Sequence, residues 1–240
     1  MQSLLVVKNL TKKHPSGGAS HLFKELNMEV RLKDSIAIQG PSGHGKSTLL
    51  RVLASLEGDH SDCLALHGRS VSAWGPCEWR KKVCYVPQQP ALVPGTIEDN
   101  LTLVSKLHHR KFDQKLAAKL IDEVGLGELD WSQDAAALSG GQKQRIQLVR
   151  SMLLESDILL LDEVSSALDA QSKLAVEATL KKWREDKGVA LIWVTHEQDQ
   201  AKRVANRFWY LENGVLTSDT IEKDGHLPPQ DEAVSTGGEM

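Results

Sequence analysis

Short apolar runs alternate along the chain with longer amphipathic stretches, and this alternation predicts the order of strands and helices. Each apolar run is bounded by polar or turn residues, which is typical of buried strands. The predicted strands are Ser35–Gln39, Val83–Val86, Ile158–Leu161 and Val189–Thr195. Helices are predicted between them, from Leu49 to a stop near Gly58 and over Ala170–Glu185. Strands that alternate with helices indicate an α/β fold with a mostly parallel sheet.

Three segments depart from this alternation. Leu4–Leu10 and Leu26–Leu32 are predicted strands that meet through a turn at Pro15–Gly18, which indicates an antiparallel β subdomain at the N-terminus. Residues from about 96 to 155 have helical periodicity interrupted by glycines, which predicts an inserted α-helical lobe. Near the other end, Asn213-Gly214 lies between two apolar runs and predicts a β-hairpin.

The last segment, residues 222–240, is polar and contains Pro-Pro and Gly-Gly pairs, so we expect a flexible C-terminal tail. Residues 1–221 are then one domain. The chain has 240 residues, 40% apolar and 25% charged, which is the composition of an ordinary globular domain. A net charge of −3 argues against a broadly basic surface, and no nucleic-acid partner is expected. No signal peptide and no apolar run of membrane-spanning length is seen, so another chain would have to provide the membrane attachment.

The strongest chemical motif is the glycine-rich string Gly40-Pro-Ser-Gly-His-Gly-Lys-Ser47, which follows a predicted strand and opens a predicted helix. Such a loop turns backbone N–H groups inward and forms an anion nest at a helix N-terminus. A turn that matches the pattern by chance is the alternative, but the flanking strand and helix favour binding of ATP or GTP. The expected phosphate-binding residues are Gly40, Pro41, Ser42, Gly43, His44, Gly45, Lys46, Ser47 and Thr48.

Two carboxylates, Asp162 and Glu163, end the predicted strand Ile158–Leu161. The carboxyl end of a strand is where α/β sheets place ligands, so Asp162 is a candidate Mg²⁺ ligand and Glu163 a candidate general base. A strand that simply leaves the core with two acidic residues would give the same pattern. The phosphate loop in the same chain favours the catalytic interpretation.

A second Ser/Gly-rich turn, Leu138-Ser-Gly-Gly-Gln142, opens another predicted helix and is a second candidate anion nest. Ser139 could be no more than a helix N-cap followed by flexible glycines. That alternative does not explain why one chain carries two such nests.

These five residues match the LSGGQ signature of ATP-binding-cassette (ABC) ATPases, and the chain resembles that family over about residues 1–216. The resemblance implies a P-loop NTPase core and assigns roles to three further residues. Gln88 matches the glutamine that senses Mg²⁺ and the permease, Asp169 lies in the match to the D-loop, and His196 matches the switch histidine. The family usually stacks adenine on an aromatic residue after the first strand, where this chain has His14.

By the same resemblance, two copies pair head to tail and clamp each ATP between Lys46 of one copy and the signature residues Ser139, Gly140, Gly141 and Gln142 of the other. Mg²⁺ is expected at Ser47, Gln88 and Asp162. Glu163 is expected to act as the base, with Lys46 and His196 stabilising charge. Closure and reopening of this ATP-dependent homodimer would drive transmembrane permease subunits, which places the chain in the cytoplasm on the inner face of the membrane.

Several functions fit the resemblance. A transporter ATPase is favoured over a soluble ABC ATPase acting on DNA or ribosomes, because one cassette fills the chain and no sustained heptads appear. Glu163 and His196 argue against a regulator without turnover. The segment Gly95–Asn100 resembles exporter-type cassettes, and the compact chain is similar to FetA-type subunits of iron or metal exporters. An importer cassette for phosphate or amino acids is the alternative.

Overall fold

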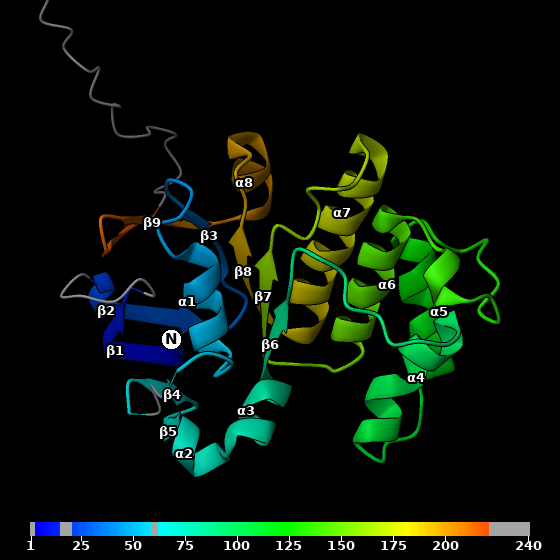
Figure 1. Ribbon diagram of the computed structural model, residues 1–240, viewed down its shortest axis with the longest axis horizontal. Coiled ribbons are helices and arrows are strands. Elements are labelled where there is room, and N and C mark those ends of the chain that lie inside the picture. The colour runs from blue at the N-terminus through cyan, green and yellow to red at the C-terminus, as the bar shows by residue number, and fades with distance from the viewer. Residues whose placement is uncertain (1–2, 15–20, 59–61, 221–240) are drawn as a thin grey trace, which may run out of the picture.

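The structure is a computed structural model that describes residues 3–14, 21–58 and 62–220. The predicted turn at Pro15–Gly18 and the predicted tail at 222–240 lie outside the described residues. Two sheets and a cluster of helices form the described part of the molecule (Figure 1). The α/β fold class with a mostly parallel sheet and an N-terminal antiparallel sheet is confirmed.

The larger sheet has six strands in the order β10-β9-β3-β8-β7-β6. Its strands are β3 (Ser35–Gln39), β6 (Val83–Val86), β7 (Ile158–Asp162), β8 (Ala190–Val194), β9 (Arg207–Glu212) and β10 (Val215–Thr220). All neighbouring pairs are parallel except β9 and β10, which form the hairpin predicted at Asn213-Gly214. Both turn residues have positive φ, 48° for Asn213 and 77° for Gly214, as the tight hairpin turn requires.

Both faces of the central strands are buried, so their apolar runs are continuous. In β7, Ile158 and Leu160 pack in one core, whereas Leu159 and Leu161 pack in the other. The first core lies between this sheet, helix α1 (Lys46–Leu53) and the smaller sheet. The second lies between this sheet and the remaining long helices. Burial on both faces explains why sequence periodicity alone predicted these strands as short unbroken apolar segments.

The smaller sheet is antiparallel, with strand order β2-β1-β4-β5. It contains β1 (Ser3–Lys13), β2 (His21–Arg31), β4 (Leu64–Leu66) and β5 (Arg69–Ser70). The first two strands are longer than predicted, because polar residues beyond their apolar centres still pair across the ladder. Leu32, which was predicted to end the second strand, lies in the turn that follows it and is 60% exposed.

Four helical elements between residues 96 and 155 form a separate group at one side of the molecule (Figure 1). They are α4 (Ile97–Leu107), α5 (Gln114–Glu123), the 3₁₀ turn η1 (Ala135–Ala137) and α6 (Gly140–Met152). This is the range in which the sequence predicts the helical lobe. Helix α7 (Ala170–Lys187) packs between this group and the larger sheet, since Val176, Leu180 and Trp183 share a core with both.

Several short elements were not predicted. They are β4, β5, α2 (Val71–Trp74), α3 (Pro76–Lys82) and α8 (Gln198–Val204). Each is too short or too polar to show a period of its own, and tertiary packing fixes it instead. In α3, for example, Trp79 is fully buried and its indole Nε1–H donates to the Leu53 carbonyl at 2.8 Å.

Candidate nucleotide site

The predicted site residues meet at one edge of the larger sheet. The phosphate loop follows β3, Gln88 follows β6, Asp162 ends β7 and His196 follows β8. These four strands are parallel neighbours in the order β3-β8-β7-β6, so their carboxyl ends lie along the same edge. Segments far apart in the sequence are brought together by the topology alone, as expected for a ligand site in an α/β sheet.

Two positions of the phosphate loop require glycine, because other segments of the same polypeptide pack closely against them. A Cβ on Gly40 would lie 2.1 Å from the Leu211 carbonyl oxygen, and one on Gly45 would lie 2.7 Å from Cγ of Leu22. Both also have positive φ, 138° and 92°. Side chains at these two positions would therefore push the loop away from the hairpin and from β2.

Helix α1 begins at this loop without a side-chain cap. Its N-cap residue is Gly45, in the left-handed conformation, and no side chain accepts from the first N–H groups. Lys46, 5% exposed, folds back so that its Nζ donates to the carbonyls of Gly40 and Pro41 at 2.7 and 2.8 Å. Burial lowers the pKa of the Lys46 ammonium, while the carboxylates of Glu163 and Asp162 oppose that shift. The loop thus presents backbone donors and a positive charge to the same space.

Asp162 is held by hydroxyl groups on both of its oxygens. Ser47 Oγ donates to one at 2.9 Å, and the Tyr85 hydroxyl donates to the other at 2.7 Å. Burial, and then the bond to Asp162, raises the pKa of Tyr85 to about 12. Tyr85 was not among the predicted site residues. Its position three residues before Gln88 was the only indication in the sequence. The structure adds that Tyr85 on β6 is in register with Leu160 on the neighbouring strand.

Glu163 lies between Gln88 and His196. The Gln88 side-chain amide donates to one carboxylate oxygen at 2.9 Å, and His196 Nε2 lies 2.5 Å from the other. Glu163 has a positive φ of 49°, unusual for this residue, and its own N–H donates to the Val194 carbonyl at 3.0 Å. A strained backbone conformation of this kind persists only where surrounding contacts hold it, and here these contacts come from Val194, Gln88 and His196.

The signature turn is satisfied by its own residues. The Ser139 hydroxyl accepts from the Gln142 N–H at 3.2 Å, and the Gln142 side chain accepts from the Ser139 N–H at 2.9 Å. This reciprocal capping box starts α6. A Cβ on Gly140 would meet nothing within 4 Å, whereas one on Gly141 would lie 3.2 Å from the Leu168 side chain. The turn therefore has one open glycine and one that faces the Ser166–Asp169 segment.

Helix α6 also holds the loop that contains Gln88. Gln144 and Gln147 each donate to the Pro87 carbonyl at 3.2 Å, and Arg150 donates to the Ala91 carbonyl at 2.6 Å. The helix that begins at the signature turn is therefore clamped to the loop that carries Gln88 to Glu163.

The remaining predicted residues have these positions. Asp169 is the N-cap of α7, where it accepts from the Ser172 N–H at 2.9 Å. His44 Nδ1 accepts from the Asn213 N–H at 3.3 Å, which ties the phosphate loop to the hairpin. His14 follows the end of β1 and is exposed, so its stacking on adenine stays a prediction. Pro41, Ser42 and Gly43 are exposed at the outer face of the loop.

The chain is similar to proteins of one family along most of its length. The family model described as "ABC transporter" matches residues 23–166. YjkB of Bacillus subtilis, named as an ABC transporter ATP-binding protein, is 33% identical over 227 residues, covering 94% of this chain and 90% of YjkB. FetA of Escherichia coli, named as an iron export ATP-binding protein, is 35% identical over 183 residues, covering 76% of this chain and 81% of FetA.

Import proteins and a solved structure are also similar. CysA of Pectobacterium atrosepticum, named as a sulfate/thiosulfate import ATP-binding protein, is 35% identical over 217 residues, covering 88% of this chain and 64% of CysA. A solved structure described as the ATP-binding subunit of an ABC transporter superposes with a TM-score of 0.80 at 25% identity. The superposition covers 92% of this chain and 91% of that one.

Proposed function

Because this chain belongs to the ABC transporter family as an ATP-binding subunit, we propose that it hydrolyses Mg²⁺-ATP between two copies of itself and drives a separate membrane permease. Subunits of this family bind and hydrolyse ATP and work with permease components, and the chain is an ATPase of this kind. The observation that carries the proposal is the convergence of Lys46, Ser47, Asp162, Glu163 and His196 on one sheet edge.

The residues present fit a triphosphate with a hard divalent cation. The uncapped start of α1 offers backbone N–H groups to an anion, and the Lys46 ammonium lies against the same loop. The Ser47 hydroxyl, the Asp162 carboxylate and the Gln88 amide supply the oxygen ligands that Mg²⁺ prefers. We assign Mg²⁺ to these three side chains, where it would neutralise phosphate charge.

In the proposed mechanism, Glu163 accepts a proton from the attacking water, since its carboxylate extends from the end of β7 beside the phosphate loop. His196 and Gln88 each contact one oxygen of that carboxylate and so fix its direction. Lys46 must exchange its two bonds to the loop carbonyls for bonds to phosphate oxygens. Positioning and charge stabilisation thus supply most of the catalysis, as is general for phosphoryl transfer.

The second half of the site is assigned to the signature turn of another copy. Within the described residues, Ser139 and Gln142 bond each other and not the phosphate loop. The capping box leaves the N–H groups of Gly140 and Gly141 at the start of α6 for an external anion. A highly charged nucleotide that bridges two such helix starts would favour a closed homodimer.

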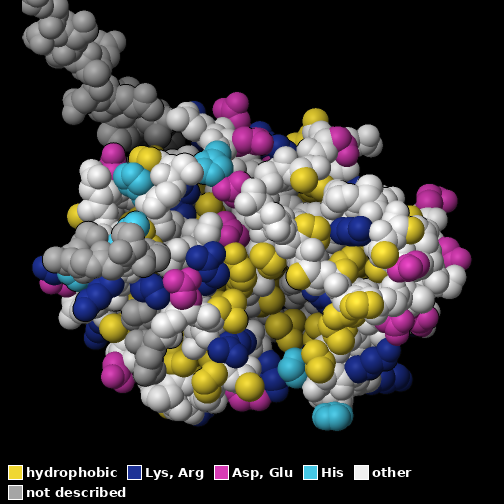
Figure 2. Space-filling model, in the orientation of Figure 1, with side chains coloured by type: hydrophobic (Ala, Val, Ile, Leu, Met, Phe, Trp, Pro, Cys, Tyr) yellow, Lys and Arg dark blue, Asp and Glu magenta, His cyan; other side chains and the backbone are white. Residues whose placement is uncertain are grey.

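Attachment to the membrane is assigned to the permease. In the part of the chain that the structure describes, no helix has the length and apolar character of a membrane span. Apolar side chains gather in a hollow between the β-rich side and the helical side of the molecule (Figure 2). Such a patch suits a permease segment that inserts between the two lobes. This arrangement would place the chain in the cytoplasm, on the inner membrane face.

Two directions of transport are supported by different relatives. Metal export, with iron as the first candidate, is proposed from the similarity to FetA and from the exporter-like segment Gly95–Asn100. Import is favoured instead by CysA, which is named for sulfate and thiosulfate rather than for the phosphate or amino acids considered from sequence. The permease that purifies with the tagged chain from its native membranes decides between them, since the permease selects the cargo.

Replacement of the proposed base tests the enzymatic part of the proposal. Glu163→Gln is expected to lower ATP turnover roughly a hundredfold to a thousandfold while nucleotide binding is retained. The matched control is Glu155→Gln, in a residue whose side chain is 44% exposed and which lies before the amino end of β7, paired with Lys187. Parental turnover in Glu163→Gln would contradict the assigned base.

A further inference from the structure

Close to Glu163 and His196 lies a connected set of polar side chains that the proposed mechanism does not use. Ser165, Glu177, Thr195 and Gln200 are buried, with exposed fractions of 3, 7, 7 and 3%. Glu177 lies on α7 and Gln200 on α8, whereas Ser165 and Thr195 lie in the loops that follow β7 and β8. Buried polar groups on this scale are costly unless each finds its partners, so their arrangement needs an explanation.

Gln200, on α8, is the centre of this set. Its Oε1 accepts from the Thr195 hydroxyl at 2.6 Å, and its Nε2 donates to Ser165 Oγ at 2.6 Å and to Glu177 Oε1 at 3.0 Å. One acceptor and both amide hydrogens are thereby used. An ionised carboxylate only accepts hydrogen bonds, so Glu177 fixes which way round the amide lies.

The two hydroxyl partners belong to the segments that carry Glu163 and His196. Ser165 lies two residues after Glu163, and Thr195 directly precedes His196. The Thr195 hydroxyl oxygen also accepts from the Glu197 N–H at 3.1 Å, so this bond joins the two residues that flank His196. We call residues 195–197 the switch segment. Gln200 therefore joins the switch segment to the segment after Glu163 through a single side chain.

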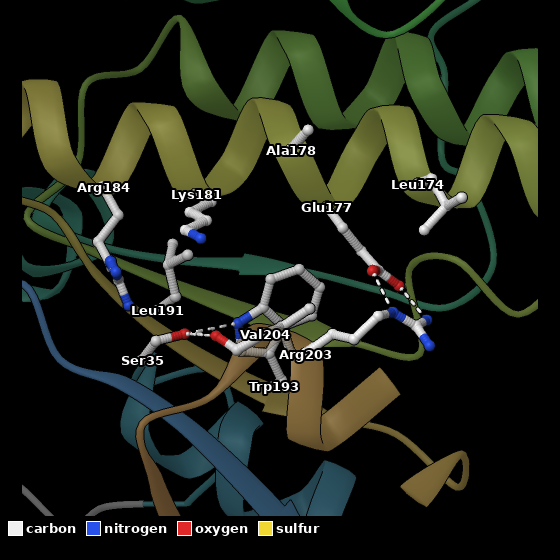
Figure 3. A pocket seen from close by; sticks show the side chains of 10 residues that line it. All are labelled: Ser35, Leu174, Glu177, Ala178, Lys181, Arg184, Leu191, Trp193, Arg203 and Val204. Carbon is white, nitrogen blue, oxygen red and sulfur yellow. Dashed lines mark hydrogen bonds and ion pairs between the residues drawn. The ribbon is translucent and has the colours of Figure 1, made fainter. Parts of the chain in front are cut away.

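The outer end of the set is anchored by a two-point ion pair. Arg203 donates from Nε and Nη2 to the two oxygens of Glu177, both at 2.9 Å. Figure 3 shows this pair beside a cavity of about 200 Å³ between α7 and α8. Because the fork geometry fixes the carboxylate plane, Glu177 gives Gln200 a rigid support on α7.

From these contacts we infer that Gln200 is a positioning residue, which holds the switch segment so that His196 meets the Glu163 carboxylate. The inference rests on the proposed function. It adds a residue that contacts neither nucleotide nor metal and acts through Thr195 and Ser165. Removal of the Gln200 amide would remove the bond that holds Thr195 in the switch segment. Glu177 would then keep only its ion pair with Arg203. The contacts of the phosphate loop would be unchanged.

Gln200→Leu tests this inference, and Gln198→Leu is the matched control. Gln198 is the same residue type on the same helix but is exposed. In Gln200→Leu, backbone amides of residues 195–199 are expected to exchange hydrogen about tenfold faster in the nucleotide-free protein. The kcat for ATP is expected to fall roughly tenfold to a hundredfold, with KM changed by less than about twofold. The control should match the parent in both measurements.

Unchanged exchange and unchanged kcat in Gln200→Leu would overturn the inference, as would equal losses in the control. If Gln200→Leu does not fold, Ser165→Ala removes a single bond of the set and must show smaller changes in the same direction. Absence of turnover in the parent protein would refute the proposed function instead. The exchange measurement needs no turnover and would still decide whether Gln200 holds the switch segment.

Discussion

The two glycine-rich turns of this protein begin helices in opposite ways. The phosphate loop starts α1 at Gly45, with no side-chain cap and with a lysine that folds back on the loop. The signature turn starts α6 at Ser139, with a complete capping box. Around the phosphate loop, contacts such as Ser47–Asp162 join residues that are 115 positions apart, whereas the contacts of Ser139 and Gln142 stay within the turn.

If two copies share the site as proposed, this difference separates the half that folding assembles from the half that a second copy provides. Folding alone brings Lys46, Asp162, Glu163 and His196 to one edge, because parallel strands end there. The capping bonds of the signature turn lie within the turn itself, and the turn contributes no residue to that cluster. We therefore expect changes in the phosphate loop to act within one copy, and changes in the signature turn to act only across two copies.

The largest effect is expected from Lys46→Ala. Loss of the ammonium should weaken ATP binding roughly tenfold to a hundredfold and reduce turnover by about a thousandfold, because the charge contacts phosphate both before and during transfer. Titration of the isolated protein with a fluorescent ATP analogue measures the first quantity. Lys106→Ala is a control, since that lysine is 63% exposed on α4. Normal ATP affinity in Lys46→Ala would contradict the assigned loop.

The next effect is expected from Gly140→Arg. A Cβ atom at this position would meet nothing within 4 Å in the single chain, so we expect folding and ATP binding by one copy to be unaffected. Turnover should fall at least about a hundredfold, because the arginine would occupy the space assigned to the facing nucleotide. Binding and turnover are compared on the same preparation. A loss of both together would show that the turn acts within its own copy.

An equal mixture of Lys46→Ala and Gly140→Arg tests whether the two halves of one site come from different copies. Each mixed dimer would contain one site with both defects and one site with none. If copies exchange freely, turnover should recover to about a quarter of the parental value. Two inactive variants that stay inactive after mixing would contradict a site shared between copies.

The smallest effect is expected from Tyr85→Phe, which removes one of the two bonds that hold Asp162. Apparent Mg²⁺ affinity should fall about tenfold, since Ser47 still holds the other oxygen. The chain has two tyrosines, and the step in tyrosinate absorbance near pH 12 should be the one that disappears in the variant. Burial and the Asp162 bond favour the neutral phenol, so ionisation occurs above the ordinary tyrosine range.

Much of this arrangement could be predicted because the signals are local. The phosphate loop, the strand before Asp162 and the Asn213-Gly214 turn each show their function within a few residues of sequence. Helix α8 gave no such signal. Its seven residues are mostly polar, and only the fold shows that Gln200 is buried among side chains from α7 and from the loops after β7 and β8.

Tyr85 is a second residue whose role local sequence does not predict. Its residue type is common in buried strands, and only the pairing of β6 with β7 reveals that its hydroxyl reaches Asp162. Contacts of this kind depend on strand order, which local periodicity does not contain. The resemblance to a known family assigned roles to residues within motifs. It assigned none to side chains outside the motifs that hold them in place, such as Tyr85 and Gln200.

We propose that nucleotide is bound between two copies, each of which provides half of the site. Sedimentation velocity of Glu163→Gln, with ATP and Mg²⁺ and then with EDTA added, tests this sharing. We expect a dimer that retains two nucleotides and returns to monomers when the metal is removed. A variant that binds ATP yet sediments as a monomer throughout, while the parent hydrolyses ATP as a monomer, would contradict it.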